Sequence, residues 1–177
     1  MKKILGVVVV LTFVLGIAGA ALAEEPAKAE KLLEVGDQMK DFTLPSLGGG
    51  EITYSKDIKG KKDLAILIFM TSACTMCQVE ITSVNDLMSK YGEKMDLYAV
   101  SVDIKGEATL KPYAEANKYK ATYLIDPKFT VGKLFGFHFT PAAVILDKNG
   151  KVAYLKGGKR GTGEETPLEE KIVSLLK

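Results

Sequence analysis

Apolar and polar residues change their spacing several times along the chain, and each change predicts an element. Alternating segments at 41–44 and 51–54 flank the glycine-rich stretch 46–50, a pattern that predicts a β-hairpin. Residues 63–70 are almost all apolar and rich in β-branched side chains. A run this short cannot span a membrane, and it predicts a buried strand in the middle of a sheet.

The apolar period becomes helical directly after this strand. Apolar residues then recur at three- and four-residue spacing over about four turns, at Cys77, Ile81, Val84 and Met88. The pattern next predicts a strand at 97–102, a helix at 108–119, a strand at 123–125 and a short helical piece at 129–135. The helix at 108–119 can tolerate Pro112 only in its first turn. A hairpin over 142–155 and a helix over 164–177 close the chain, and the helix carries an apolar face of Leu168, Ile172, Leu175 and Leu176.

This order of elements predicts the fold class. Strands alternate with helices, and an antiparallel hairpin and a helix follow, which is typical of an α/β domain with a mixed sheet and helices on both faces. The early hairpin is an addition at the N-terminal side of that domain. Because there are no internal repeats and no second domain, we expect a single folded domain over 35–177.

The N-terminal residues are typical of an export signal. Lys2 and Lys3 precede an apolar run that begins at Ile4, and Ala21-Leu22-Ala23 supplies the small-x-small pattern of a cleavage site. We therefore expect a signal peptide over 1–23 and a tether over 24–34. The alternative is an uncleaved membrane anchor, since the run is about as long as a bilayer span. Both interpretations place the domain outside the cytoplasm, in the periplasm or an equivalent extracytoplasmic space, where a cysteine pair can stay oxidised.

Composition narrows the possible partners. The chain has 177 residues with 24 Lys plus Arg against 22 Asp plus Glu, and the only arginine is Arg160. Removing residues 1–23 takes away two lysines, so the mature domain is formally neutral. A nucleic-acid partner is disfavoured because no dense basic tract exists. A domain of this size can bury a sufficient core without disulfide staples, so its two cysteines have another use.

Cys74 and Cys77 lie where the first buried strand passes into its helix. The family that places a Cys-x-x-Cys at this junction is the thioredoxin superfamily. Within it, the chain resembles the ResA/TlpA-like exported thiol–disulfide oxidoreductases from about Leu33 to the C-terminus. The shared motifs are Val35-Gly36-Asp37, Phe42-Thr43-Leu44, the glycine turn, Gly60-Lys61, Thr140-Pro141 and Asp147 to Val152.

The chemistry of this pair follows from its place at a helix start. Free backbone N–H groups and the helix dipole stabilise a thiolate at Cys74, which makes it the attacking residue. Cys77 lies one turn inside the helix, within disulfide reach, and would resolve a mixed disulfide formed at Cys74. An inert disulfide would close too small a loop to stabilise the fold much. A zinc site would need four ligands, and the chain offers two cysteines and one histidine.

The resemblance implies roles for further residues. Glu80, three residues after Cys77, matches a glutamate found near the dithiol in ResA-like proteins, where it would relay protons or raise the thiol pKa. The alternative for Glu80 is an ordinary solvated helix residue. Pro141 matches the cis-proline that faces the dithiol, so the Thr140–Pro141 bond is predicted to be cis. The backbone of Thr140 would pair with an extended substrate segment.

The chain also departs from the family pattern. Ala73 replaces a usual tryptophan, and Thr82 stands where a helix proline is common. The dipeptide between the cysteines is Thr75-Met76, with neither proline nor histidine, so these two substrate-facing positions leave the substrate preference open. His138, between two phenylalanines, is interpreted as a packed side chain.

Two other functions remain as alternatives. A copper chaperone could use Cys74, Cys77, Met70, Met76 and His138 as soft or imidazole ligands, although such proteins of this fold usually place three residues between their cysteines. A peroxidase of peroxiredoxin type would carry a threonine three residues before its reactive cysteine, as Thr71 is in this chain. It would also carry a proline at position 67, where the chain has Leu67.

The function expected from these residues is disulfide exchange with protein clients, without a bound cofactor or metal. Reduction is favoured as the direction, because Thr75 and Met76 bring no positive charge to Cys74 and Glu80 opposes ionisation. A membrane-bound or extracytoplasmic thiol protein would supply the electrons. Reductive roles in the resembling family include preparation of apocytochrome c for haem attachment.

Overall fold

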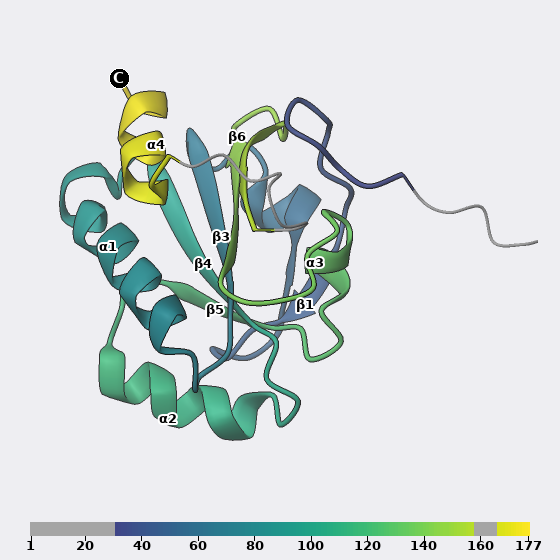
Figure 1. Cartoon of the computed structure of the whole chain (residues 1–177), viewed down its shortest axis with the longest axis vertical. Coiled ribbons are helices and arrows are strands. Elements are labelled where there is room, and N and C mark those ends of the chain that lie inside the picture. The colour runs from purple at the N-terminus through teal and green to yellow at the C-terminus, as the bar shows by residue number, and fades with distance from the viewer. Residues whose placement is uncertain (1–30, 158–165) are drawn as a thin grey trace, which may run out of the picture. The chain divides into compact units, whose positions relative to one another are not determined.

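A five-stranded mixed sheet forms the centre of the domain, in the order β5-β4-β3-β6-β7 (Figure 1). The computed structural model describes residues 31–157 and 166–177 of the chain. β3 pairs in parallel with β4 and antiparallel with β6, so it is the middle strand, as its apolar run predicts. The strands are β3 (Leu64–Met70), β4 (Met95–Ser101), β5 (Thr122–Ile125), β6 (Ala142–Asp147) and β7 (Val152–Lys156).

A separate two-stranded sheet precedes this core. It is formed by β1 (Thr43–Pro45) and β2 (Glu51–Thr53), which pair antiparallel and confirm the predicted hairpin. The backbone N–H of Leu47 donates to the carbonyl of Tyr123, which joins the hairpin to the edge strand β5. One turn of π-helix, η1 (Tyr54–Ile58), follows β2 where the sequence indicates no helix.

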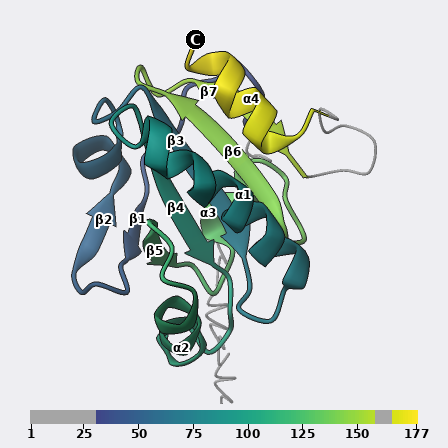
Figure 2. The ribbon, with the colours of Figure 1, turned by 90° about the vertical axis from the view of Figure 1, so that its left-hand side faces the viewer.

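Helices cover both faces of the central sheet, as the sequence predicts. Alternate residues of β3 enter two separate cores: Leu67 and Phe69 face one, while Ile66 and Ile68 face the other. The first core is closed by α3 and η1, and the second by α1, α2 and α4, with α1 lying across the strands in Figure 2. The helices are α1 (Thr75–Tyr91), α2 (Glu107–Asn117), α3 (Thr130–Lys133) and α4 (Leu168–Leu175).

Three details differ from the sequence-based expectation. Pro112 is the sixth residue of α2 rather than part of its first turn. Pro112 has no N–H to donate to the carbonyl of Ala108 one turn earlier, and Ala108 is an exposed residue, where water can take the place of that donor. Leu175 is 40% exposed, whereas the other predicted apolar positions of α4 are buried. Leu33, expected in the tether, is buried and donates its N–H to the carbonyl of Leu134.

Some predictions concern residues outside the described ranges. The signal peptide over 1–23, the tether as far as residue 30 and the expected start of the last helix at Glu164 all lie there. Within 31–157 and 166–177, no helix combines the length and the apolar character needed to cross a membrane.

Candidate active site

Three loops meet at one edge of the central sheet. The last residues of β3 and β4, Met70 and Ser101, are partners in the parallel ladder. At the same edge, Phe69 of β3 is paired with Ala142, the first residue of β6. The segments that follow β3 and β4 and the segment that precedes β6 therefore leave the sheet together. This register places Cys74 between the loop of Asp103 and the loop of Pro141.

Cys74 is the N-cap of α1, as the sequence predicts. Its Sγ accepts a hydrogen bond from the backbone N–H of Cys77 at 3.1 Å, and its carbonyl accepts one from Gln78 at 3.1 Å. A sulfur atom at this position lies against the free N–H groups and the positive end of the helix dipole. Once reduced, this sulfur is therefore in a position that stabilises a thiolate.

The two cysteines are joined in a disulfide but differ in exposure. Their Cα atoms are 5.2 Å apart, within the usual range for a disulfide. Cys74 is partly exposed, whereas Cys77 is 0% exposed and belongs to the core between α1 and the sheet. A sulfur from another molecule can therefore approach Cys74 and not Cys77.

The loop between β3 and α1 is held from the end of β4. Asp103 accepts hydrogen bonds from the backbone N–H of Ser72 at 2.9 Å and from its hydroxyl at 3.1 Å. The hydroxyl of Ser101, which is fully buried, donates to the same carboxylate at 2.8 Å. Asp103 was not among the residues predicted from the sequence. The one feature of the sequence that could have indicated Asp103 is its position, two residues after a buried strand that ends in serine.

Glu80 is buried, with 8% of its surface exposed, so it is not the solvated residue of the alternative interpretation. Its Oε1 lies 3.1 Å from Nζ of Lys156 on β7. The pair is within ion-pair distance but lacks hydrogen-bond geometry, and Oε1 has no hydrogen-bond partner among the described residues. Glu80 and Cys77, three residues apart on α1, lie on the same side of the helix.

The loop before β6 carries the predicted proline. The Thr140–Pro141 peptide bond is cis, as expected. Thr140 and Pro141 are partly exposed, and Phe139 is 50% exposed. The interpretation of His138 as a packed side chain is wrong, because His138 is exposed while its neighbour Phe137 is buried. Phe137, rather than His138, packs into the core that α3 and η1 close.

The surface beside Cys74 carries apolar side chains. Met76 is 65% exposed and Val79 is 55% exposed on the first turns of α1, and Thr75 is exposed beside them. Ile104, next to Asp103, is 93% exposed. Within residues 31–157 and 166–177, no three His, Cys, Asp or Glu side chains gather as metal ligands would.

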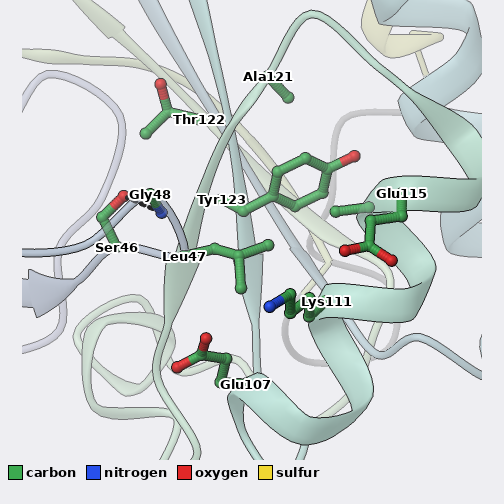
Figure 3. Close-up of a pocket in the computed structure, with 10 residues that line it drawn as sticks. Ser46, Leu47, Gly48, Glu107, Lys111, Glu115, Ala121, Thr122 and Tyr123 are labelled. Carbon is green, nitrogen blue, oxygen red and sulfur yellow. Dashed lines mark hydrogen bonds between the residues drawn. The ribbon is translucent and has the colours of Figure 1, made fainter.

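A separate hollow of about 540 Å³ lies between the hairpin turn, the start of β5 and α2 (Figure 3). Leu47 projects into this space, with Lys111 and Glu107 of α2 facing it. Tyr123 forms part of the wall, and burial raises its pKa to about 12. Neither cysteine nor Pro141 contributes to the lining, so this hollow is distinct from the disulfide.

Comparison with known sequences identifies a family. Residues 35–155 match the family described as AhpC/TSA. The chain is 30% identical over 152 residues to the thiol-disulfide oxidoreductase ResA of Bacillus thuringiensis subsp. konkukian (strain 97-27), covering 85% of this chain and 86% of that protein. It is 28% identical over 166 residues to the thioredoxin-like protein YneN of Bacillus subtilis (strain 168), covering 93% of this chain and 94% of that protein.

A solved structure agrees with these sequences. The domain superposes with a TM-score of 0.68 on a Chlorobium tepidum protein provisionally assigned as the thiol:disulfide interchange protein DsbE. That protein is 27% identical, and the match covers 82% of this chain and 99% of the other. The names of these relatives and the Cys74–Cys77 disulfide at the start of α1 thus point to the same chemistry.

Proposed function

Since the chain belongs to the AhpC/TSA family and, with its Cys-x-x-Cys disulfide, to the ResA-like thiol–disulfide oxidoreductases of the thioredoxin fold, we propose that it is an extracytoplasmic reductant of protein disulfides. Thiol–disulfide exchange itself follows from the family. The direction, the location and the roles of single residues are the proposal. The observation that carries it is the contrast between an accessible Cys74 at the helix N-cap and a buried Cys77.

The cysteines would act in two steps. The Cys74 thiolate attacks one sulfur of a client disulfide, so that a Cys74–client disulfide forms and the other client sulfur leaves as a thiolate. Cys77 then loses its proton, and its sulfur attacks Sγ of Cys74. The second client sulfur leaves and the Cys74–Cys77 disulfide forms. The client has gained two electrons and the protein has lost two.

Client binding would use the two segments that flank Cys74. On one side, Thr140 offers its backbone to an extended client segment, and Pro141 has no N–H that would compete. On the other side, Thr75 and Met76 lie on the exposed first turn of α1. Apolar side chains at the same edge of the sheet, Phe139 among them, favour a polypeptide client over a small polar disulfide.

Reduction is supported by the charges near Cys74. The dipeptide Thr75-Met76 carries no cation, and the buried acid Glu80 lies one turn further along α1. A thiolate stabilised only by the helix start is less stable than one with nearby cations, which makes the disulfide form a weaker oxidant. In this proposal Glu80 accepts the proton of Cys77.

The location is supported by the sequence of residues 1–23, which as an export signal would direct the folded domain out of the cytoplasm. If the signal is not cleaved, the same segment anchors the protein to the membrane. A thiol protein of the membrane or of the extracytoplasmic space would return electrons to the Cys74–Cys77 disulfide. Apocytochrome c is one client that this role would include.

The proposal is tested by trapping clients. In Cys77→Ser, Cys74 attacks but cannot be released, so mixed disulfides with clients should accumulate as reductant-sensitive bands. Cys74→Ser is the matched control and should trap none. Trapping by Cys74→Ser and not by Cys77→Ser would contradict the roles assigned to the two cysteines. Mixing the reduced wild-type protein with hydrogen peroxide or Cu(I) tests the peroxidase and copper-chaperone alternatives in the same preparation.

A further inference from the structure

Lys156 reaches the dithiol region from a strand that carries none of the expected site residues. It is the last residue of β7 and is paired with Ala143 of β6, two residues after Pro141. Its Nζ lies 3.1 Å from Oε1 of Glu80, whose side chain is 7% exposed, while the Lys156 side chain is 39% exposed. The lysine therefore brings its charge from the surface to a buried carboxyl on α1.

A buried carboxylate is costly unless a charge or hydrogen bonds compensate the lost water. Oε1 of Glu80 receives no hydrogen bond from the described residues, so the positive charge of Lys156 is the compensation that the structure offers it. Without that charge, burial would favour the protonated, neutral carboxyl. A protonated Glu80 cannot accept another proton.

We propose that Lys156 is a positioning residue that keeps Glu80 ionised beside Cys77, so that Glu80 can take the Cys77 proton during release of the client. This inference rests on the role of Glu80 in the proposed function. The proton passes from the Cys77 thiol to the Glu80 carboxylate while the Cys77 sulfur bonds to Sγ of Cys74 and the Cys74–client bond breaks. Lys156 exchanges no electron or proton in this step.

The other charged groups on the elements packed against α1 contact other residues than Glu80 or lie at another part of the sheet. On α4, Lys171 lies with its Nζ 5.7 Å from the centre of the Tyr154 ring, and Glu169 and Glu170 line a hollow with Leu87, further along α1. On β4, Asp96 is paired with Ala65, near the opposite end of the sheet from Met70.

The remaining neighbours of α1 contribute little charge. β3 contains only apolar residues, and β6 has its only charged residue, Asp147, paired with Leu64 at the far end of β3. Asp103 beyond β4 is bonded to Ser72 and Ser101. On α1 itself, Cys77 and, three turns beyond Glu80, Tyr91 lie on the side that carries Glu80. The pair of Glu80 and Lys156 is thus the charged unit on the side of α1 that carries the buried Cys77.

The two exchange steps can be measured separately in a single turnover. The reduced protein is mixed with an equimolar aromatic disulfide whose released thiol is coloured. The first phase of colour reports attack by Cys74, and the second reports attack by Cys77 on the mixed disulfide. Both rates are recorded across pH for the wild type, Lys156→Met, Lys156→Gln, Lys156→Arg, Glu80→Gln and the double variant Glu80→Gln/Lys156→Met.

We expect the neutral variants Lys156→Met and Lys156→Gln to slow the second phase about tenfold on the acid side of its pH profile, and little above it. The midpoint of its acid limb should move up by about one pH unit, because an opposite charge at this distance commonly changes an ionisation by that amount or more. The first phase should stay within about twofold of wild type. Lys156→Arg keeps the charge and should keep the wild-type profile. In Glu80→Gln the limb due to Glu80 should be lost, so that the second phase rises only through ionisation of the Cys77 thiol at higher pH, and adding Lys156→Met should change the profile little further.

Each failure points to a different residue. If Glu80→Gln retains the wild-type midpoint of the acid limb, the role of Glu80 in the proposed function is wrong, and the inference falls with it. If Glu80→Gln removes the limb but both neutral Lys156 variants keep the wild-type midpoint, only the inference on Lys156 is overturned. The inference is also overturned if Lys156→Arg behaves like Lys156→Met, because charge would then not be what Lys156 supplies.

Discussion

The two halves of α1 follow opposite rules of burial. From Ile81 onward the helix is ordinarily amphipathic: Ile81 and Val84 are fully buried, and Asp86 and Lys90 are exposed. Before Ile81, Met76 and Val79 are exposed while Glu80 is buried with the sulfur of Cys77. Apolar groups left in water and an acid kept from it do not stabilise a fold. We therefore propose that the first half is arranged for disulfide exchange, whereas the second is arranged for packing.

This division predicts that the largest loss of activity comes from one atom, the sulfur of the residue that caps the first half. Cys74→Ser replaces the accessible sulfur at the N-cap with a hydroxyl, which cannot form a disulfide. Exchange with a protein disulfide should fall to the uncatalysed rate, while the thermal midpoint stays near that of the reduced wild type. Residual turnover well above the uncatalysed rate would assign the attack to another group.

The second half should respond in the opposite way. Ile81→Ala removes a fully buried side chain and should lower the free energy of unfolding by about 2–5 kcal/mol. The exchange rate of the folded protein should stay near wild type. Denaturant unfolding of the reduced protein and the single-turnover rates measure the two effects. Asp86→Ala, at an exposed position of the same half, is the control and should change stability by less than about 0.5 kcal/mol.

Asp103 should affect both the stability and the exchange rate, because its hydrogen bonds stabilise the fold and also hold the loop that precedes Cys74. Asp103→Ala leaves the N–H of Ser72 and the buried hydroxyl of Ser101 without their acceptor. We expect a loss of about 1.5–3 kcal/mol in stability and a slower first phase of exchange. Asp103→Asn keeps one acceptor oxygen and should recover part of both. An unchanged first phase in Asp103→Ala would limit this residue to stability.

The smallest expected effect is on the ionisation of Cys74. Glu80→Gln removes a negative charge near the dithiol and leaves Lys156 unneutralised, so the pKa of the Cys74 thiol should fall by a fraction of a unit. Alkylation rates of the reduced protein across pH measure this value. A rise in the thiol pKa would mean that Glu80 stabilises the thiolate and would reverse its assigned effect.

The sequence was informative where a single element determines the outcome. Apolar spacing predicted the strands and the strand-to-helix junction at which the two cysteines lie, since these depend on neighbours in the chain. Asp103 and Lys156 were not found, because their partners Ser72 and Glu80 lie on other elements and nothing in a local pattern joins them. Pro112 was expected in the first turn of its helix and lies in the second, because the exposure of Ala108, one turn before it, is visible only in the fold.

The reduction potential of the Cys74–Cys77 pair tests the central claim most directly. A thiolate stabilised by the helix start, with the charge of Lys156 offset by the buried acid Glu80 and no cation between the cysteines, should give a reductant. Equilibration with glutathione or dithiothreitol buffers should place the potential near that of thioredoxin, about −270 mV, and far from the roughly −120 mV of a strong oxidant. A value above about −180 mV would contradict the reductant role and make the protein a donor of disulfides.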